Sequence, residues 1–426
     1  MTYPDSYYRR TMADQTVRPS LAGNVDCDTV IVGGGLAGLT TALQLARGGQ
    51  AVAVLEAESI GFGASGRNGG FVSPGYATGT AEIARIAGED AARRLHLLSI
   101  EGMDFVRETI EALAIRDALP TRGITSVLRY ADGASLKAHA ETMRWLYDYQ
   151  LDYLDRDQVR SVLKSDRYFQ ALRDRRAFHI HPLNYLRALA GEIERLGGLI
   201  YESTAATRVV LDGAEKRVLA EGGEVRARTV VFTTGGYTGS LHGRLKRAFL
   251  PIATYVMVSE EAPDLIASAI ATADAIGDNR RAGDYYRVVD GGKRLLWGGR
   301  ITTRAASTDA LVRELRAEMV GTYPQLSGLK TELAWSGLMS YARHLMPQIG
   351  RMSPGVWYCT AFGGHGLNTT AIGGKVVAEG ILGQSERYKL YQPFGLVWAG
   401  GLAGLAVAQL TYWKLQAQDW WRERAA

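Results

Sequence analysis

A strand, a glycine cluster and a helix follow one another near the start of the chain, and this order constrains the fold most strongly. Residues 28–33 (DTVIVG) are a β-branched run typical of a buried parallel strand, and Gly33, Gly35 and Gly38 complete a G-x-G-x-x-G pattern. Helix-forming residues then fill positions 36–47. Glycine lets the backbone turn sharply and come close to a pyrophosphate, which the free N–H groups of the helix attract. The segment predicts a dinucleotide site in an α/β domain.

An acidic residue follows the next predicted strand. That strand covers residues 51–55, and Glu56 stands at its end, 23 positions after Gly33. A carboxylate here accepts hydrogen bonds from a ribose diol and disfavours the 2′-phosphate of NADP. The glycine pattern alone is a weak signal in a chain with 50 glycines. Strand, helix, second strand and acid in register indicate a true dinucleotide site, although they do not distinguish FAD from NAD.

Two further glycine-rich loops favour FAD. Residues 63–70 (GASGRNGG) form a small-residue loop that can lie against a flat ring, the alternative being a flexible surface loop. Near the other end, a predicted strand at 356–360 leads into residues 362–370 (FGGHGLNTT) and a helical stretch at 371–380. If this second helix points at the C2 carbonyl of a flavin, its dipole stabilises the anionic reduced ring.

Composition and charge limit the class of protein. The chain has 426 residues, of which 46% are hydrophobic and 22% charged, which suits a soluble protein of two interleaved domains. Cys27 and Cys359 cannot form a disulfide framework or a zinc site, so we expect a reducing compartment and no metal. The net charge of +5 comes from scattered arginines, which argues against nucleic acid and fits an anionic cofactor or membrane surface. The N-terminus lacks a signal-peptide core, so we expect a cytoplasmic protein.

These strings together resemble the D-amino-acid oxidase superfamily of flavoproteins, and within it the γ-glutamylputrescine oxidoreductase-like branch. The resemblance spans nearly the whole chain and is carried by Tyr7-Tyr8, residues 30–35, residues 54–57, residues 61–70 and Gly364–Gly366. It implies an α/β fold with a discontinuous Rossmann-like FAD-binding domain of the glutathione-reductase type and an antiparallel-sheet substrate domain (α+β). It also implies FAD as the cofactor and oxidation of a small amine or amino acid.

The resemblance assigns contacts to each part of FAD. Glu56 would hold the ribose, and the loop at 65–70 and residues 364–369 would enclose the flavin ring. Residues 204–206 would meet the adenine, and the strand at 229–236 would cross the pyrophosphate. The residues expected to bind the cofactor are Gly33, Gly35, Leu36, Ala37, Gly38, Glu56, Ala57, Gly63, Ala64, Ser65, Arg67, Asn68, Gly69, Gly70, Ala206, Thr234, Gly235, Gly364, His365, Gly366, Leu367 and Thr369.

The predicted domains alternate along the chain. Residues 25–80, 177–245 and 345–385 would build the FAD-binding domain, and residues 81–176 and 246–344 the substrate domain. The first of the substrate stretches is expected to be mainly helical, and the second to contain strands at 253–259 and 294–299. Residues 386–426 remain as a C-terminal apolar tail.

This tail suggests contact with a membrane. Residues 394–413 are mostly apolar, with Trp398, Tyr412 and Trp413 near the ends, and are long enough to span a bilayer. Four glycines interrupt the run, and the basic residues beyond it would lie on the wrong side of the membrane if FAD is cytoplasmic. We therefore favour an interfacial helix over packing on protein, and both over a true span.

Amine oxidation by hydride transfer requires a neutral nitrogen, a donor carbon against flavin N5 and a dry site, but no dedicated acid–base pair. Aromatic side chains in segments that resemble the cover of the flavin would hold the amine, and Arg67 or Arg343 would anchor a distal carboxylate. Each aromatic residue has core packing as its alternative role, and each arginine a surface position. Predicted catalytic residues are His365, Arg67, Tyr285, Trp335 and Arg343, with Tyr255, Tyr286 and His344 as further positioning residues.

Two absences in the sequence bear on the cofactor chemistry. Related enzymes tether the flavin through a cysteine near residues 335–340, where this chain has none, so we expect noncovalent FAD. Some relatives place an oxygen-activating lysine in a stretch that here has none between Lys293 and Lys330. O2 and a membrane quinone both stay open as electron acceptors. The alternatives to an amine oxidase are a membrane-associated amino-acid dehydrogenase that reduces quinone and a noncatalytic flavoprotein.

Overall fold

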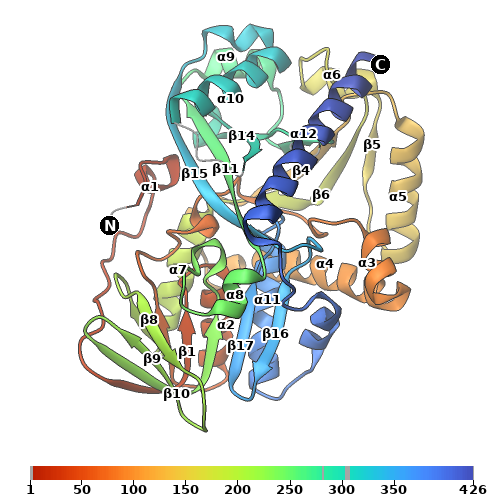
Figure 1. Ribbon diagram of the computed structural model, residues 1–426. Helices are drawn as coiled ribbons and strands as arrows, with labels where there is room; N and C mark the ends of the chain where they lie inside the picture. Colours follow the sequence, from red (N-terminus) through yellow and green to blue (C-terminus); the bar gives the residue numbers. More distant parts are fainter. Residues whose placement is uncertain (1–2, 281–282, 303–307, 426) are drawn as a thin grey trace.

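Two large sheets, one above the other in Figure 1, organise the molecule. The computed structural model describes residues 3–280, 283–302 and 308–425. Within them the first sheet has eight strands in the order β16-β17-β10-β1-β2-β7, with β9 paired to β10 and β8 paired to β9. Its strands are β1 (Val25–Val32), β2 (Val52–Leu55), β7 (Leu199–Tyr201), β8 (Ala206–Val210), β9 (Lys216–Ala220), β10 (Gly223–Phe232), β16 (Gln348–Ser353) and β17 (Val356–Thr360).

The centre of the first sheet is parallel. Strand β1 pairs in parallel with β2 and β10, and β10 pairs in parallel with β17. Helices α2 (Leu36–Arg47), α7 (Pro182–Arg195) and α11 (Leu367–Ile381) pack in a shared core with this sheet. A Cβ at Gly38 would lie 2.1 Å from the carbonyl oxygen of Gly33, so α2 can approach β1 this closely only with glycine there. The doubly wound arrangement confirms the predicted α/β fold.

The second sheet is mostly antiparallel. Its nine strands follow the order β15-β11-β14-β13-β12-β4-β6-β3, with β5 paired to β6, and only the β12–β4 pair is parallel. The strands are β3 (Phe71–Val72), β4 (Thr121–Val127), β5 (Asp152–Leu154), β6 (Ala171–His179), β11 (Leu250–Ser259), β12 (Ala275–Asp278), β13 (Tyr285–Val289), β14 (Arg294–Thr302) and β15 (Thr331–Tyr341).

The other helices lie mainly around the second sheet (Figure 1). They are α1 (Tyr7–Arg10), α3 (Thr80–Ala87), α4 (Glu89–Ala112), α5 (Gly133–Tyr147), α6 (Arg156–Val162), α8 (Gly243–Arg247), α9 (Pro263–Ala269), α10 (Thr308–Thr322) and α12 (Gly401–Ala425). The strands of the first sheet come from three separate stretches of chain, as the discontinuous fold class implies. The predicted domain boundaries remain a proposal. Strand β3 departs from them because it pairs with β6 in the second sheet.

The C-terminal tail differs from the sequence expectation. Phe394 ends a short 3-10 segment (Arg387–Phe394) and is fully buried in the core of the first sheet. The helix begins only at Gly401, because Gly400 and Gly401 adopt positive φ values of 93° and 56° and break the apolar run. None of the helices in the described ranges combines the length and apolar character needed to cross a bilayer.

Candidate active site

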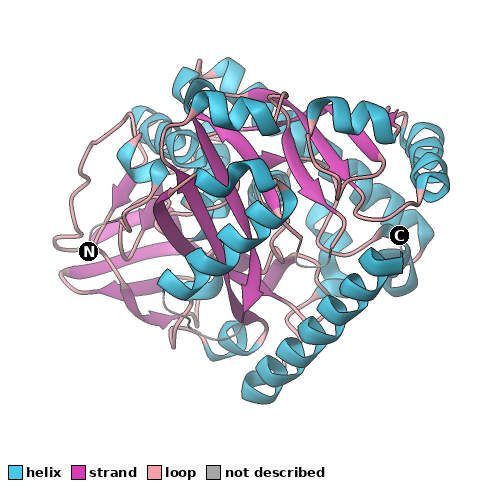
Figure 2. Ribbon diagram, turned by 90° about the horizontal axis from the view of Figure 1, so that it is seen from above, coloured by secondary structure: helices cyan, strands magenta, loops and turns pink. Residues whose placement is uncertain are grey.

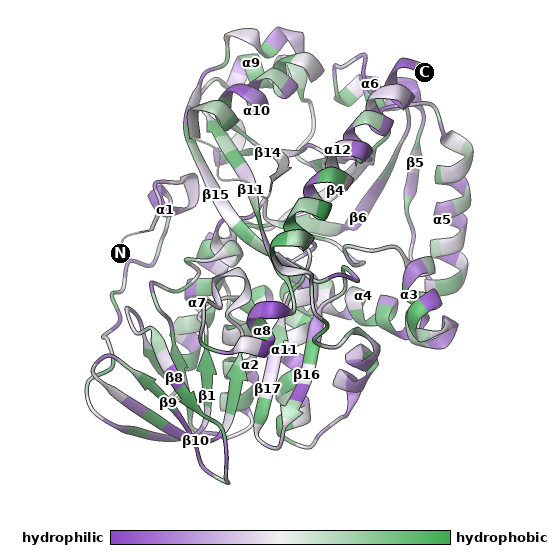
Figure 3. Cartoon of the chain, viewed as in Figure 1, coloured by the Kyte–Doolittle hydropathy of each residue, from purple (hydrophilic) through white to green (hydrophobic). Residues whose placement is uncertain are grey.

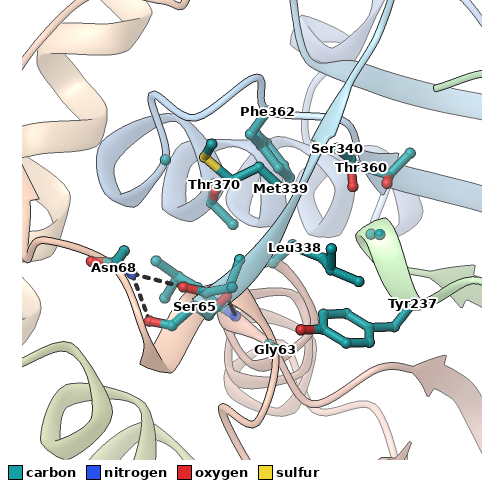
Figure 4. A pocket seen from close by; sticks show the side chains of 18 of the residues that line it. Gly63, Ser65, Asn68, Tyr237, Leu338, Met339, Ser340, Thr360, Phe362 and Thr370 are labelled. Atoms are coloured by element: carbon teal, nitrogen blue, oxygen red, sulfur yellow. Dashed lines mark hydrogen bonds between the residues drawn. The ribbon is translucent and has the colours of Figure 1, made fainter. Parts of the chain in front are cut away.

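A cavity of about 960 Å³ opens at the carboxyl ends of β1, β2, β10 and β17 and extends to β13 and β15 of the second sheet. Strand β1 lies between β2 and β10, so the strand order reverses beside the cavity. Such a reversal is where doubly wound sheets bind ligands. Figure 4 shows part of the wall, with Leu338 and Met339 of β15 between the loop around Ser65 and the start of α11.

The first glycine turn forms one end of the cavity. Gly35 is the N-cap of α2 and has no side chain of its own to cap the helix, while the Leu36 N–H donates to Ser65 Oγ at 3.0 Å. Glu56 Oε2 accepts the Gly34 N–H at 2.6 Å, and its Oε1 accepts the N–H of Glu58 at 3.0 Å. Burial raises the pKa of Glu56, and these two backbone bonds oppose the shift. The Glu56 carboxylate is therefore fixed at the cavity wall, as a group that binds a ribose must be.

The loop at residues 63–70 folds back on itself. Asn68 Nδ2 donates to the carbonyl oxygens of Ala64 at 3.1 Å and Ser65 at 2.8 Å (Figure 4). Asn68 Oδ1 accepts the N–H of Gly70 at 2.8 Å. Tyr8 adds a bond from its hydroxyl to the Asn68 carbonyl oxygen at 2.7 Å. The amide of Asn68 thus fixes the shape of the loop, which presents its small residues to the cavity.

Arg67 lines the cavity with part of its guanidinium unpaired. The guanidinium lies 4.2 Å from the centre of the Phe62 ring, and Nη1 donates to the Ser336 carbonyl oxygen at 3.2 Å. Nε and Nη2 are buried without a hydrogen-bond partner in the protein. Burial lowers the pKa of Arg67. Since buried donors are nearly always satisfied, these two N–H groups fit the acceptor atoms of a bound flavin or substrate.

His365 is held by the loop opposite it. Its Nε2 lies 3.2 Å from the Ser73 carbonyl oxygen and 3.1 Å from that of Pro74, so Nε2 must carry the proton and donate. Burial lowers the pKa of His365, which makes the imidazole neutral at pH 7. Helix α11 begins immediately after it, with Gly366 as an N-cap that offers no side chain. The sequence placed this helix four residues too late, at 371, because Leu367–Thr370 were assigned to the preceding loop.

Tyr285 reaches the cavity because two glycines leave room for its ring. A Cβ would lie 2.7 Å from the ring at Gly69 and 2.2 Å from it at Gly298. The centres of the Tyr285 and Phe71 rings lie 5.8 Å apart in an edge-to-face arrangement, and the Tyr285 hydroxyl forms a hydrogen bond with the side chain of Thr254. Burial raises the pKa of Tyr285, so the phenol stays protonated at neutral pH.

The structure brings most predicted site residues to one cavity. In its wall are Gly33, Gly35, Leu36, Ala37, Glu56, Ala57, Gly63, Ala64, Ser65, Arg67, Asn68, Gly69, Ala206, Thr234, Gly235, Tyr285, Gly364, His365, Gly366 and Leu367.

Three predicted cofactor residues lie behind this wall. Gly38 packs α2 against β1, as described above. Gly70 has a φ of 83°, and a Cβ there would lie 2.3 Å from the Ile180 carbonyl oxygen. Thr369 is fully buried and donates from Oγ1 to the carbonyl oxygen of His365. All three shape the wall from outside the cavity.

Five predicted substrate residues are also absent from the wall. Trp335 is buried and donates from Nε1 to the Arg67 carbonyl oxygen at 2.9 Å, which supports the loop from outside. Arg343 is exposed. Tyr286 stacks on Trp297 at 4.2 Å within the core of the second sheet. The same core holds Tyr255, and His344 accepts the Met346 N–H at 3.1 Å from a position against Phe394.

Sequence reasoning missed several residues of the wall. Neutral ones come from the ends of β10, β15 and β17: Tyr237, Leu338, Met339, Tyr341 and Phe362. The alternation Gly337, Met339, Tyr341 is a signal for Met339 and Tyr341 alone, because side chains two apart share a face of a strand.

A charged group also lies in the wall, formed by Asp278, Arg280 and Asp284. Arg280 donates to both carboxylates, from Nη2 to Asp278 Oδ2 at 2.7 Å and to Asp284 Oδ2. The buried Arg129 donates to the same two acids. Burial raises the pKa of Asp284 to about 6, although both arginines oppose the shift. No motif in the sequence marks these residues, which belong to the end of β12 and the loop after it.

Comparisons with known proteins agree with this geometry. The family model described as DAO, FAD dependent oxidoreductase, matches residues 28–380. Gamma-glutamylputrescine oxidoreductase of Escherichia coli (strain K12) is 33% identical over 391 residues, which is 91% of each chain. The probable oxidoreductase OrdL of Haemophilus influenzae is 30% identical over 91% of this chain and 90% of its own.

Solved structures show the same fold at lower identity. Glycine oxidase from Geobacillus kaustophilus superposes with a TM-score of 0.74 at 19% identity, covering 88% of this chain and 99% of that one. L-amino acid deaminase from Proteus myxofaciens superposes with a TM-score of 0.72 at 17% identity, covering 89% and 95%. With the family model matched over most of its length, this chain belongs to the DAO family of FAD-dependent oxidoreductases, and FAD is its cofactor.

Proposed function

We propose that this enzyme oxidises the carbon next to the nitrogen of a small amine or amino acid, with a γ-glutamylputrescine-like compound as the first candidate. The nitrogen reacts as the neutral amine: the C–H bond breaks, its two electrons leave as hydride, and the nitrogen lone pair forms the C=N bond of an iminium. The iminium then loses a proton to water and becomes the imine. Water then hydrolyses the imine to a carbonyl compound and an amine. Bound FAD supplies the hydride acceptor, its N5 atom.

The character of the cavity wall carries this proposal. His365 and Tyr285 are half-buried and neutral at pH 7, and Met339 and Phe362 add apolar surface. Such surroundings disfavour an ammonium and leave the lone pair available on the substrate nitrogen. No group in the described wall has to take up a proton for hydride to leave. The residues that act here position the substrate and exclude water.

The cavity wall also has charged side chains that could bind a charged group at the far end of the substrate. Arg67 offers two unpaired N–H donors, and Arg280 and Asp284 add one cation and one carboxyl in the same wall. A γ-glutamyl compound or an amino acid carries a carboxylate that Arg67 would bind. We assign Arg67 to this role, and we do not assign it to Arg343, because that side chain is exposed.

We infer that FAD is bound noncovalently. The Cys359 thiol packs toward Gly373 of α11, and burial raises its pKa far above the usual range. Cys27 lies on β1 outside the cavity wall, and burial raises the pKa of its thiol to about 12. Neither thiol is a nucleophile at neutral pH. Both cysteines are free, in keeping with a cytoplasmic location.

The electron acceptor we propose is a quinone, with O2 as the alternative. No lysine lies among the described residues of the cavity wall, so the cation that some relatives use to activate O2 has no counterpart there. Stopped-flow mixing of the reduced enzyme with air-saturated buffer and with a soluble quinone tests this choice. Reoxidation by O2 that keeps pace with turnover would favour an oxidase.

An anaerobic absorbance titration tests the substrate class. Purified holoenzyme is titrated with γ-glutamylputrescine, simple polyamines, N-methyl amino acids, and D- and L-amino acids. Bleaching of the FAD spectrum by γ-glutamylputrescine at the lowest concentration supports the proposal. Bleaching by α-amino acids instead would support an amino-acid dehydrogenase. A fully loaded enzyme that none of these compounds bleaches would contradict amine oxidation.

A further inference from the structure

Helix α12 (Gly401–Ala425) exposes several of its large apolar side chains. Figure 2 shows it along the outside of the molecule, and its inner side holds the buried Gln409 and the half-buried Tyr412, Gln416 and Glu423. The outer face of α12 consists of Val407, Leu410, Lys414, Ala417, Trp421 and Arg424, all of them exposed. These positions follow a spacing of three and four residues, so they share one side of the helix. A surface helix normally turns side chains such as Leu410 and Trp421 toward the protein.

Exposed apolar side chains are concentrated in this part of the chain. Of the 14 large hydrophobic side chains that are exposed among the described residues, eight lie between residues 397 and 421, and the other six are scattered. Leu410 is 61% exposed and Trp421 is 70% exposed. A contiguous apolar surface of this kind marks an interaction site.

The charges of α12 are sorted between its two sides. Lys414, Arg422 and Arg424 are exposed, whereas Asp419 and Glu423 are half-buried on the inner side. Glu423 lies 3.9 Å from the guanidinium groups of Arg129, Arg167 and Arg280. The exposed surface of the helix therefore offers cations without carboxylates among its described residues.

A second group of cations lies at the start of the helix. Ala399 donates its backbone N–H to the Arg247 carbonyl oxygen at 2.8 Å, which brings the segment before α12 next to α8. Helix α8 exposes Arg244, Lys246 and Arg247. Figure 3 shows the hydrophilic α8 beside the hydrophobic first half of α12 and hydrophilic residues again at the C-terminus. Cations thus flank an apolar stripe at both ends.

We propose that the outer face of α12 lies on an anionic lipid surface, with the helix parallel to the membrane plane. Apolar and tryptophan side chains between basic residues are the pattern of a helix that rests in the headgroup region. Anionic lipids would neutralise the cations that the protein itself leaves unopposed. A second copy of the chain fits less well, because a two-fold contact through this face would bring identical cations together.

The inner side of the same helix lies near two residues of the cavity wall. Glu423 approaches Arg280 of the cavity wall, and Tyr412 lies near Tyr341. Burial, and to a smaller extent the Tyr412 phenol, raise the pKa of Tyr341 to about 12. A membrane beneath α12 would consequently lie next to the substrate side of the cavity.

Vesicle flotation of the holoenzyme tests this proposal. We expect the protein to rise with vesicles of equal parts phosphatidylglycerol and phosphatidylethanolamine, and to stay below with phosphatidylcholine alone. The double variant Leu410→Glu/Trp421→Glu should abolish flotation. Lys414→Gln and Arg424→Gln should each weaken binding roughly fivefold at low salt. The matched control is Trp145→Glu on α5, since Trp145 is 86% exposed away from α12 and should leave flotation unchanged.

FAD absorbance and turnover with a soluble acceptor show whether each variant is folded, and both should match the parent enzyme. Two results would overturn the proposal. The first is a holoenzyme that ignores anionic vesicles at low salt. The second is a dimer, measured by light scattering, that Leu410→Glu/Trp421→Glu converts to monomer, because a second copy would then cover this face.

Discussion

The two sides of the cavity are built in different ways. The cofactor side consists largely of backbone, with Gly35 and Gly366 capping α2 and α11 without side chains, and with the Glu56 carboxylate held by two N–H groups. The side that we propose for the substrate consists of side chains from β13, β15 and the loop after β12, such as Tyr285 and Met339. Backbone recognition of a fixed cofactor demands glycines at fixed spacing, whereas a side-chain wall can change with the substrate.

This difference predicts that substitutions on one side reduce FAD binding and those on the other reduce the reaction with the substrate. The largest effect is expected on the cofactor side. In Gly35→Val the added methyl groups occupy the space that a pyrophosphate needs beside α2, where even a Cβ would lie 3.1 Å from Ser65 Oγ. We expect a colourless protein that has lost essentially all bound FAD. Absorbance of the purified protein, scaled to its concentration, measures the loss.

The control for this variant is Gly191→Val. Gly191 lies in α7, and nothing is within 4 Å of the position that its Cβ would take. A β-branched residue there costs some helix propensity but leaves the cofactor site intact, so the protein should be yellow. A yellow, fully loaded Gly35→Val would show that the turn at 33–38 does not hold the pyrophosphate.

The same difference explains how much the sequence could predict. Helix α2 was predicted at its observed bounds, because the glycines that the cofactor requires also mark where strand and helix begin and end. The roles assigned to Trp335 and Arg343 had no such support: one side chain packs behind the Arg67 loop and the other is exposed. Asp284 lies in the cavity wall but comes from a loop that has no sequence motif. Only the folded arrangement of the two sheets brings this loop to the cavity.

Arg67 connects the two sides, and its replacement should have the next largest effect. Arg67→Lys keeps the positive charge but loses the planar fork whose Nε and Nη2 are unpaired. We expect KM for a carboxylate-bearing substrate to rise roughly 10- to 100-fold, the cost of a charge-assisted hydrogen bond, while KM for a simple diamine changes little. Steady-state kinetics with both substrates measure this split. Equal losses for both would place Arg67 against FAD rather than the substrate.

A smaller effect should follow when Tyr285 is displaced without being replaced. In Gly298→Ala the new Cβ would overlap the Tyr285 ring at 2.2 Å, so the ring has to move. We expect FAD occupancy to stay complete and the rate of anaerobic FAD reduction to fall about tenfold, because misplacement of a positioning group slows hydride transfer. Tyr285→Phe keeps the ring in place and should reduce the rate less. Loss of FAD from Gly298→Ala would contradict the separation of the two sides.

The smallest expected change concerns pH, and it tests whether any wall residue controls protonation. Burial lowers the pKa of His365, so the imidazole is already neutral at neutral pH and does not change its charge as the pH rises further. The substrate ammonium must lose its proton before hydride leaves, so kcat/KM should rise with pH up to the pKa of the free amine. Between two substrates whose amine pKa values differ by about one unit, the rising limb of the pH profile of kcat/KM should therefore move by about one unit.

The variant His365→Asn should leave this rising limb in place, since Asn can still donate to the Ser73 and Pro74 carbonyl oxygens. A limb that moves with the variant and not with the substrate would make His365 the group that titrates, and the cavity wall would then take part in proton transfer.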